Sequence, residues 1–279
     1  RIHHELSGLA GIERMKALDD ALESADAMEE MLDALCVLND RVVAADRQLL
    51  LVCEDSFMPE AVDVLATQWS QATGGSNGSD GVDLDGFEVP PLDQAWVTTT
   101  QVNFCAMAIP TVPEDHPDAA ALTVLGGVLR NGYLHKVLRE QGGAYGGGAS
   151  HDSSNGIFRF HSYRDPNLLR TFEAFGESVN WVIKRDIGFD LVEESILGIM
   201  AGIDAPASPA GSARQAFHHA LFGRTAEHRR RIRAHILEVG VDDIKRVAET
   251  YLTVPGSRAV LTSEAGAASL PDSFVITDI

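Results

Sequence analysis

Apolar residues recur at helical spacing along much of the first seventy residues, and one short apolar run interrupts that pattern. A first helix is predicted after Ser7, which can cap its opening turn, and a second helix through residues 28–38. Residues 48–53 are almost continuously apolar, as expected of a buried strand, and Pro59 then opens a third helix. This stretch therefore predicts the order helix, helix, strand, helix.

A single strand leaves its backbone N–H and C=O groups unpaired, so the strand at residues 48–53 must join a sheet formed by other residues. These other strands are expected either from the second domain or from residues upstream of Arg1. We therefore expect the chain to be a truncated piece of a larger fold.

The clearest change in composition separates two predicted domains. Residues 74–81 are a glycine- and serine-rich polar tract, typical of a flexible connection. The sequence predicts the rear part of a truncated α/β domain at residues 1–72, a flexible linker at residues 73–94, and a second α/β domain at residues 95–279.

The second domain alternates strand and helix signals. The segments Tyr145–His151 and Ile157–Tyr163 flank a turn-rich sequence and predict a β-hairpin. A strand within Val97–Ile109 and a closing strand at Ser257–Thr262 complete the predicted sheet, and helices are predicted after Pro117 and after Pro166. This order indicates an α/β (α+β) fold in which helices cover one face of a sheet.

Composition narrows the class of partner. Lysine and arginine number 22 against 41 aspartates and glutamates, a formal net charge of −19, which argues against nucleic acid or an anionic membrane as partner. No apolar run reaches the length of a membrane span, and the first residues do not have the layout of a signal peptide. The three cysteines are widely spaced and predict buried free thiols, hence a cytoplasmic or other reducing soluble compartment.

The ten histidines do not form a recognisable metal motif. His3, His4 and Glu5 have the wrong spacing for an inverted zinc motif, and the adjacent His218 and His219 point in different directions on a helix. We therefore predict no metal site and no cofactor in this chain. A nucleophile elbow and a phosphate-binding loop are also missing from the sequence.

The segment Leu138–Gly146 carries the most informative chemistry. Arg139 is predicted to end a helix, and the following glycines allow a tight turn into a strand near Tyr145. This geometry could bring the guanidinium of Arg139 and the phenol of Tyr145 close together. Both groups donate hydrogen bonds and suit a carbonyl oxygen that gains negative charge during amide hydrolysis. The competing interpretation is structural: Arg139 favours the helix C-terminus, and Tyr145 packs in the sheet.

This segment resembles the arginine–tyrosine motif in the second half of pitrilysin-like zinc metallopeptidases, the insulin-degrading group. The sequence Gly142-Gly143-Ala144-Tyr145-Gly146 is similar to that of the presequence-protease branch of this group. Residues 7–11 and the segment Ser162–Leu168 resemble the same branch, so that the likeness extends over nearly the whole chain.

The resemblance implies a pitrilysin-type domain with a mostly antiparallel sheet, preceded by a partial domain of the same kind. Such enzymes consist of two halves, and the zinc and general base lie in the amino-terminal half. By resemblance, Arg139 and Tyr145 would bind the peptide substrate near the scissile bond. This chain would be the carboxy-terminal half without zinc, inactive alone, and its partner would be the zinc-bearing half.

Two other functions stay open. Related chains without zinc motifs serve as non-catalytic partners, so a separate zinc-bearing subunit could complete the enzyme. The chain could also be a stand-alone peptide-binding protein.

Overall fold

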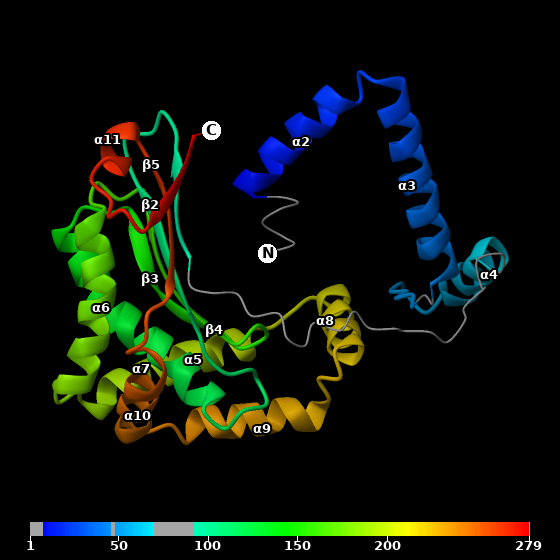
Figure 1. The fold of residues 1–279 in the computed structure, drawn as a ribbon. Helices are drawn as coiled ribbons and strands as arrows, with labels where there is room; N and C mark the ends of the chain where they lie inside the picture. The colour runs from blue at the N-terminus through cyan, green and yellow to red at the C-terminus, as the bar shows by residue number, and fades with distance from the viewer. Residues whose placement is uncertain (1–7, 46–47, 70–91, 279) are drawn as a thin grey trace. The chain divides into compact units, whose positions relative to one another are not determined.

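The computed structural model describes residues 8–45, 48–69 and 92–278 and divides the chain into two compact units (Figure 1). One unit comprises Arg1–Glu88 with Ala207–Gly223, and the other comprises Val89–Pro206 with Arg224–Ile279. Ser7 and most of the predicted linker lie outside the described residues, and the three predicted domain boundaries stay a prediction.

The first unit contributes helices. Its helices are α2 (Leu9–Ala21), α3 (Ala25–Ala44), α4 (Met58–Trp69) and α8 (Pro209–Leu221). The first three confirm the helices predicted from the apolar spacing. Helix α3 has no buried residue, and its apolar stripe, which includes Met28, Leu32, Leu35 and Leu38, is exposed.

The predicted strand at residues 48–53 is wrong. The structure describes these residues without a strand, and α4 begins at Met58. A strand exists only where a neighbour accepts its backbone hydrogen bonds, and none of the described strands pairs with this segment. The apolar run indicates a tendency to be buried, but it carries no information about a partner.

The second unit is built on a six-stranded sheet with the order β3-β4-β2-β5-β1-β6. Its strands are β1 (Asp93–Val97), β2 (Phe104–Pro110), β3 (Gly146–Asp152), β4 (Ile157–Tyr163), β5 (Ser257–Thr262) and β6 (Phe274–Asp278). The pairings β3–β4, β4–β2 and β2–β5 are antiparallel, whereas β1 runs parallel to both β5 and β6. The mostly antiparallel sheet and the β3–β4 hairpin are thereby confirmed.

Two features of the sheet differ from the prediction. The strand expected within Val97–Ile109 is β2, which begins only at Phe104, and β1 is a separate strand in front of it that ends at Val97. Between them, the Thr100 hydroxyl bonds the Val102 backbone and forms a local turn. Strand β6 was not predicted at all, since its five residues carry too short a pattern.

Helices pack against one face of this sheet and against one another (Figure 1). They are α5 (Ala119–Leu129), η2 (Arg130–Gln141), α6 (Leu169–Lys184), α7 (Phe189–Ile203), α9 (Ala226–Leu237), α10 (Val241–Tyr251) and the short α11 (Glu264–Ala267). Helix α5 is buried on almost every side, because it lies between the sheet and the outer helices α7, α9 and α10. It continues directly into η2, a wider π-helical segment.

The alternation along β4 defines the two faces of the sheet. Phe158 and Phe160 point into the core, whereas Arg159, His161 and Tyr163 are exposed. We call the side of β3, β4 and β2 that carries these three residues the open face.

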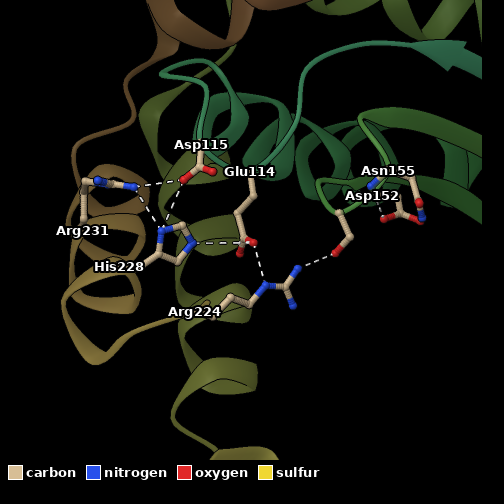
Figure 2. Close-up of polar contacts among 8 residues, drawn as sticks. Glu114, Asp115, Asp152, Asn155, Arg224, His228 and Arg231 are labelled. Atoms are coloured by element: carbon tan, nitrogen blue, oxygen red, sulfur yellow. Dashed lines mark hydrogen bonds and ion pairs between the residues drawn. The ribbon is translucent and has the colours of Figure 1, made fainter. Parts of the chain in front are cut away.

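A polar network fixes the turn of the β3–β4 hairpin at the end remote from Tyr163 (Figure 2). Arg224, just before α9, donates to the Ser154 hydroxyl at 2.7 Å and pairs with Glu114 at 2.9 Å. His228 of α9 lies 3.7 Å from Glu114 and 3.4 Å from Asp115, in the loop between β2 and α5. The hairpin turn is therefore bonded to Arg224, which Glu114 of that loop holds in place.

Candidate functional site

The turn from η2 into β3 depends on two glycines. The N–H groups of Gly142 and Gly143 both donate to the Arg139 carbonyl, and the Ala144 N–H donates to the Leu138 carbonyl at 2.9 Å. A Cβ atom on Gly142 would lie 2.6 Å from the Leu138 oxygen, and Gly143 has a φ of +80°. Gly142 is therefore favoured because a side chain would collide with the preceding helix, and Gly143 because of its left-handed backbone conformation.

Arg139 occupies the last turn of η2, and its side chain is exposed. Its Nη1 atom lies 3.3 Å from Nε2 of His135, one turn earlier. His135 in turn has its Nδ1 atom 3.5 Å from a Glu140 oxygen. Arg139 has no ion pair with a carboxylate in the part of the chain that the structure describes, so its donors are available to a ligand.

Tyr145 stands at the entrance to β3, where its side chain is 69% exposed. Its N–H donates to the Arg164 carbonyl at 3.3 Å, which joins the turn to the end of β4. The ring packs edge-on against Tyr163, with centroids 5.6 Å apart, and the Arg164 guanidinium lies 6.0 Å from its centroid. The ring is thus held by neighbours.

Arg164 belongs to the segment Ser162–Leu168 and has an unusual backbone. Its φ of 48° lies in the left-handed region, where a non-glycine residue persists only if its surroundings impose the conformation. Its guanidinium also lies 5.5 Å from the Tyr163 centroid, and Tyr163 contacts Phe104 at 5.4 Å. Arg164 and the rings of Tyr145, Tyr163 and Phe104 therefore form one cluster.

The residue after Arg164 supplies the constraint on its backbone. Asp165 is fully buried, and its carboxylate accepts from the Asn167 N–H at 2.9 Å and from the Thr171 hydroxyl at 2.7 Å. Its own N–H and C=O pair with the backbone of Asn103. The Asn167 amide then donates to the Gly142 carbonyl at 2.7 Å. Three segments distant in sequence are thereby hydrogen-bonded together: the start of β2, the turn after η2 and the segment after β4.

Both predicted site residues lie where the sequence placed them, at the helix end and the strand start. No hydrogen bond or ring contact joins their side chains within the described residues, because Arg139 faces His135 and Tyr145 faces Tyr163. Their convergence on a ligand stays a prediction. The sequence interpretation assigned no role to Arg164 or Asn167, although both lie in a segment that it had singled out.

The described residues contain no group of three or more His, Cys, Asp or Glu side chains placed to hold a metal ion. The donor set of this part of the chain does not fit a zinc site, and no step of the proposed chemistry is assigned to a metal here. Among the same residues, the helices are too short or too polar to cross a bilayer.

The cysteines match the prediction only in part. All three are free thiols, but Cys36 is exposed and Cys53 is half-buried, so the predicted burial is wrong for these two. The described residues of the unit that contains them are mostly exposed, whereas Cys105 lies in the core of the sheet. Burial raises the pKa of the Cys105 thiol to about 12.

Comparison with known families decides the relationship. The profile of the PreP C-terminal domain family matches residues 93–260, which include the whole turn with Arg139 and Tyr145. The chain belongs to the PreP C-terminal domain family. This membership confirms the predicted resemblance to the presequence-protease branch.

Curated relatives of this PreP C-terminal domain are named mitochondrial presequence proteases. The chain is 42% identical to the Yarrowia lipolytica protein over 160 residues, covering 57% of the chain and 16% of that protein. It is 32% identical to the Emericella nidulans protein over 260 residues, covering 91% of the chain and 24% of that protein. The chain thus spans at most about a quarter of the length of these two relatives.

Solved structures of low sequence identity share the fold. A protease from Helicobacter pylori aligns with a TM-score of 0.58 at 14% identity, covering 76% of this chain and 53% of that one. Pitrilysin aligns with a TM-score of 0.55 at 14% identity, covering 79% and 25%. An M16 peptidase inactive domain from Pseudomonas fluorescens aligns at 0.54 with 15% identity, covering 74% and 51%. The predicted pitrilysin-type fold is confirmed.

Proposed function

We propose that this PreP C-terminal domain is the zinc-free part of a peptide-degrading metallopeptidase, in which Arg139 and Tyr145 hold the peptide substrate beside the bond to be cleaved. The observation that carries the proposal is the turn between η2 and β3. It presents a guanidinium and a phenol, both exposed and without a carboxylate partner in the described residues.

The chemistry requires donors aimed at a developing negative charge. When water attacks an amide, the carbonyl oxygen becomes an oxyanion, and donors fixed in advance stabilise it more than they stabilise the substrate. The Tyr145 ring is held by Tyr163 and by the Arg164 guanidinium, so its hydroxyl has a defined direction. In the proposed complex, the Arg139 guanidinium leaves His135 and donates to the same peptide carbonyl group.

The remaining catalytic groups would come from elsewhere. In this proposal, the zinc ion and the general base belong to an amino-terminal half, which is either on the same polypeptide or on a separate subunit. The names of the relatives place those proteins in mitochondria. A soluble, reducing compartment for this chain stays a prediction.

The test uses this chain together with its zinc-bearing half. We expect Arg139→Ala and Tyr145→Phe each to reduce kcat by about 10²- to 10³-fold, because each change removes one donor to the oxyanion. Arg185→Ala is the matched control, since Arg185 is an exposed arginine just after the far end of α6. Near-normal kcat for both site variants would remove the proposed role.

A reconstitution experiment separates the alternatives. We expect no peptide hydrolysis by the 279-residue chain alone and hydrolysis after addition of a zinc-bearing half. Peptide binding by the chain without any gain of hydrolysis on mixing would instead favour a stand-alone binding protein.

A further inference from the structure

The open face of the β3–β4 hairpin has a regular composition that the proposed function does not use. Its register places Gly146 opposite Tyr163, Gly148 opposite His161, and Ser150 opposite Arg159. Strand β3 thus presents only very small side chains beside three large ones. On the open face, the side chains of β4 therefore project further from the sheet than those of β3.

Small side chains also flank β4 on its other neighbouring strand, β2. Strand β2 places Ala106 beside His161 and Ala108 beside Arg159. The two basic side chains on β4 therefore rise from a floor of small residues on both sides. Gly146 leaves this floor open, since an added Cβ there would have no atom within 4 Å.

A third basic side chain reaches this floor from η2. The stem of Arg130 crosses Gly148, where an added Cβ would lie 2.9 Å from Arg130 Cγ. A side chain at position 148 would displace that stem, so the glycine leaves the space that Arg130 occupies. Desolvation lowers the pKa of the His161 imidazole, and the nearby positive charges of Arg159 and Arg130 lower it further. The two guanidinium groups therefore supply the positive charge of this face, and His161 adds a hydrogen-bonding ring between them.

Few acidic side chains pair with the basic residues of the open face in the part of the chain that the structure describes. Asp152 lies 3.7 Å from Arg159, but its carboxylate also accepts hydrogen bonds from Asn155. Both partners of that ion pair are partly solvated, which makes it weak and open to exchange. Neither Arg130 nor His161 has a carboxylate partner within the residues that the structure describes. A chain of net charge −19 thus has a basic patch on this face.

The basic patch lies within reach of a peptide bound at the candidate site. Arg159 and Tyr163 are four residues apart on β4, which corresponds to about 13 Å along a strand. An extended peptide advances by the same length per residue. A peptide lying along the hairpin with one carbonyl group at Tyr145 would therefore bring a group about four residues away to Arg159.

We propose that Arg130, Arg159 and His161 form a subsite that binds a carboxylate of the peptide, about four residues from the bond held at Arg139 and Tyr145. The inference rests on the proposed function, because it places the peptide along the hairpin. The carboxylate is either an acidic side chain or the free C-terminus of the peptide. Both have the same chemistry, and arginine binds both with paired hydrogen bonds.

The experiment measures the binding of fluorescent, unstructured peptides to the 279-residue chain by anisotropy. A reference peptide has no acidic side chain and ends in an amide. One set of peptides restores the free C-terminus, and another introduces a single Glu at successive positions, with Gln at the same positions as the control. These two arms distinguish the two sources of the carboxylate.

We expect one arm to bind about tenfold more tightly than the reference peptide, the ratio that one charge-assisted hydrogen bond supports. The Glu arm should show this gain at one position only. Raising the salt concentration should reduce the gain. Arg159→Gln and Arg130→Met should reduce it to less than about twofold, and methionine keeps an apolar stem over Gly148. Arg185→Gln is the control and should preserve it.

Equal binding of all peptides would overturn the subsite and leave the proposed function standing. A gain that survives both arginine variants would also overturn it. If no peptide binds at all, the subsite is rejected, and the turnover of the Arg139 and Tyr145 variants still decides the proposed function separately.

Discussion

Replacing Asp165 by alanine tests how much the buried carboxylate stabilises the segment after β4, whose Asn167 side chain bonds the Gly142 carbonyl of the site turn. Asp165 is fully buried and accepts hydrogen bonds from the Asn167 N–H at 2.9 Å and the Thr171 hydroxyl at 2.7 Å. The Asn167 side-chain amide donates to the same carboxylate at 3.2 Å. Hydrogen bonds to a charged group contribute about 1.5–3 kcal/mol each, and the alanine variant removes all three. Because burial of the carboxylate itself offsets part of this gain, we expect a loss of about 3 kcal/mol.

That loss is large relative to the total stability of a domain, about 5–15 kcal/mol. The free energy of unfolding can be measured specifically in the second unit by urea-dependent labelling of Cys105, which is 1% exposed and reacts only after unfolding. Mass spectrometry of the labelled peptide separates Cys105 from the exposed Cys36.

Thr171→Val provides the matched control, because it removes one of the three hydrogen bonds to the carboxylate and keeps the side-chain shape. We expect about 1–1.5 kcal/mol for this variant. The double variant should cost less than the sum of the two single variants, since both remove the same contact. A loss below about 0.5 kcal/mol for Asp165→Ala would mean that the buried carboxylate contributes no more than an ordinary surface side chain.

The other predictions concern the turn and two buried groups. Gly143→Ala should destabilise the second unit by about 1–2 kcal/mol in urea unfolding, because Gly143 has a φ of +80°; an unchanged midpoint would contradict this. Burial lowers the pKa of His151 below its ordinary value of 6.5, so the unfolded chain binds a proton that the folded chain does not. Stability should therefore fall as the pH drops below 6.5, and His151→Gln should weaken that dependence; a pH-independent midpoint in the parent chain would argue against it. Since burial raises the pKa of Cys105 to about 12, iodoacetamide at pH near 8 should label exposed Cys36 in the native chain and leave Cys105 unlabelled.

Much of the second unit could be predicted because its signals are local. Apolar spacing gave the helices, turn residues gave the β3–β4 hairpin, and the two glycines gave the turn after Arg139. Strand pairing is not local, which is why the sequence misassigned residues 48–53 and missed β6. Whether a segment pairs as a strand depends on residues far away in sequence, and the apolar pattern of the segment itself does not identify them.

The candidate site divides in the same way. Arg139 and Tyr145 could be found because they flank a recognisable turn. The hydrogen bond from Asn167 to Gly142 crosses 25 residues, and the left-handed backbone of Arg164 follows from the burial of the next residue. Neither has a periodic signal, so only the folded arrangement reveals them.

The most direct test is a crystal structure of this chain with its zinc-bearing half and an uncleavable peptide. We predict that a guanidinium nitrogen of Arg139 and the phenol oxygen of Tyr145 both lie within about 3.2 Å of one peptide carbonyl oxygen next to the scissile position. A peptide bound with that carbonyl far from both side chains would contradict the proposal.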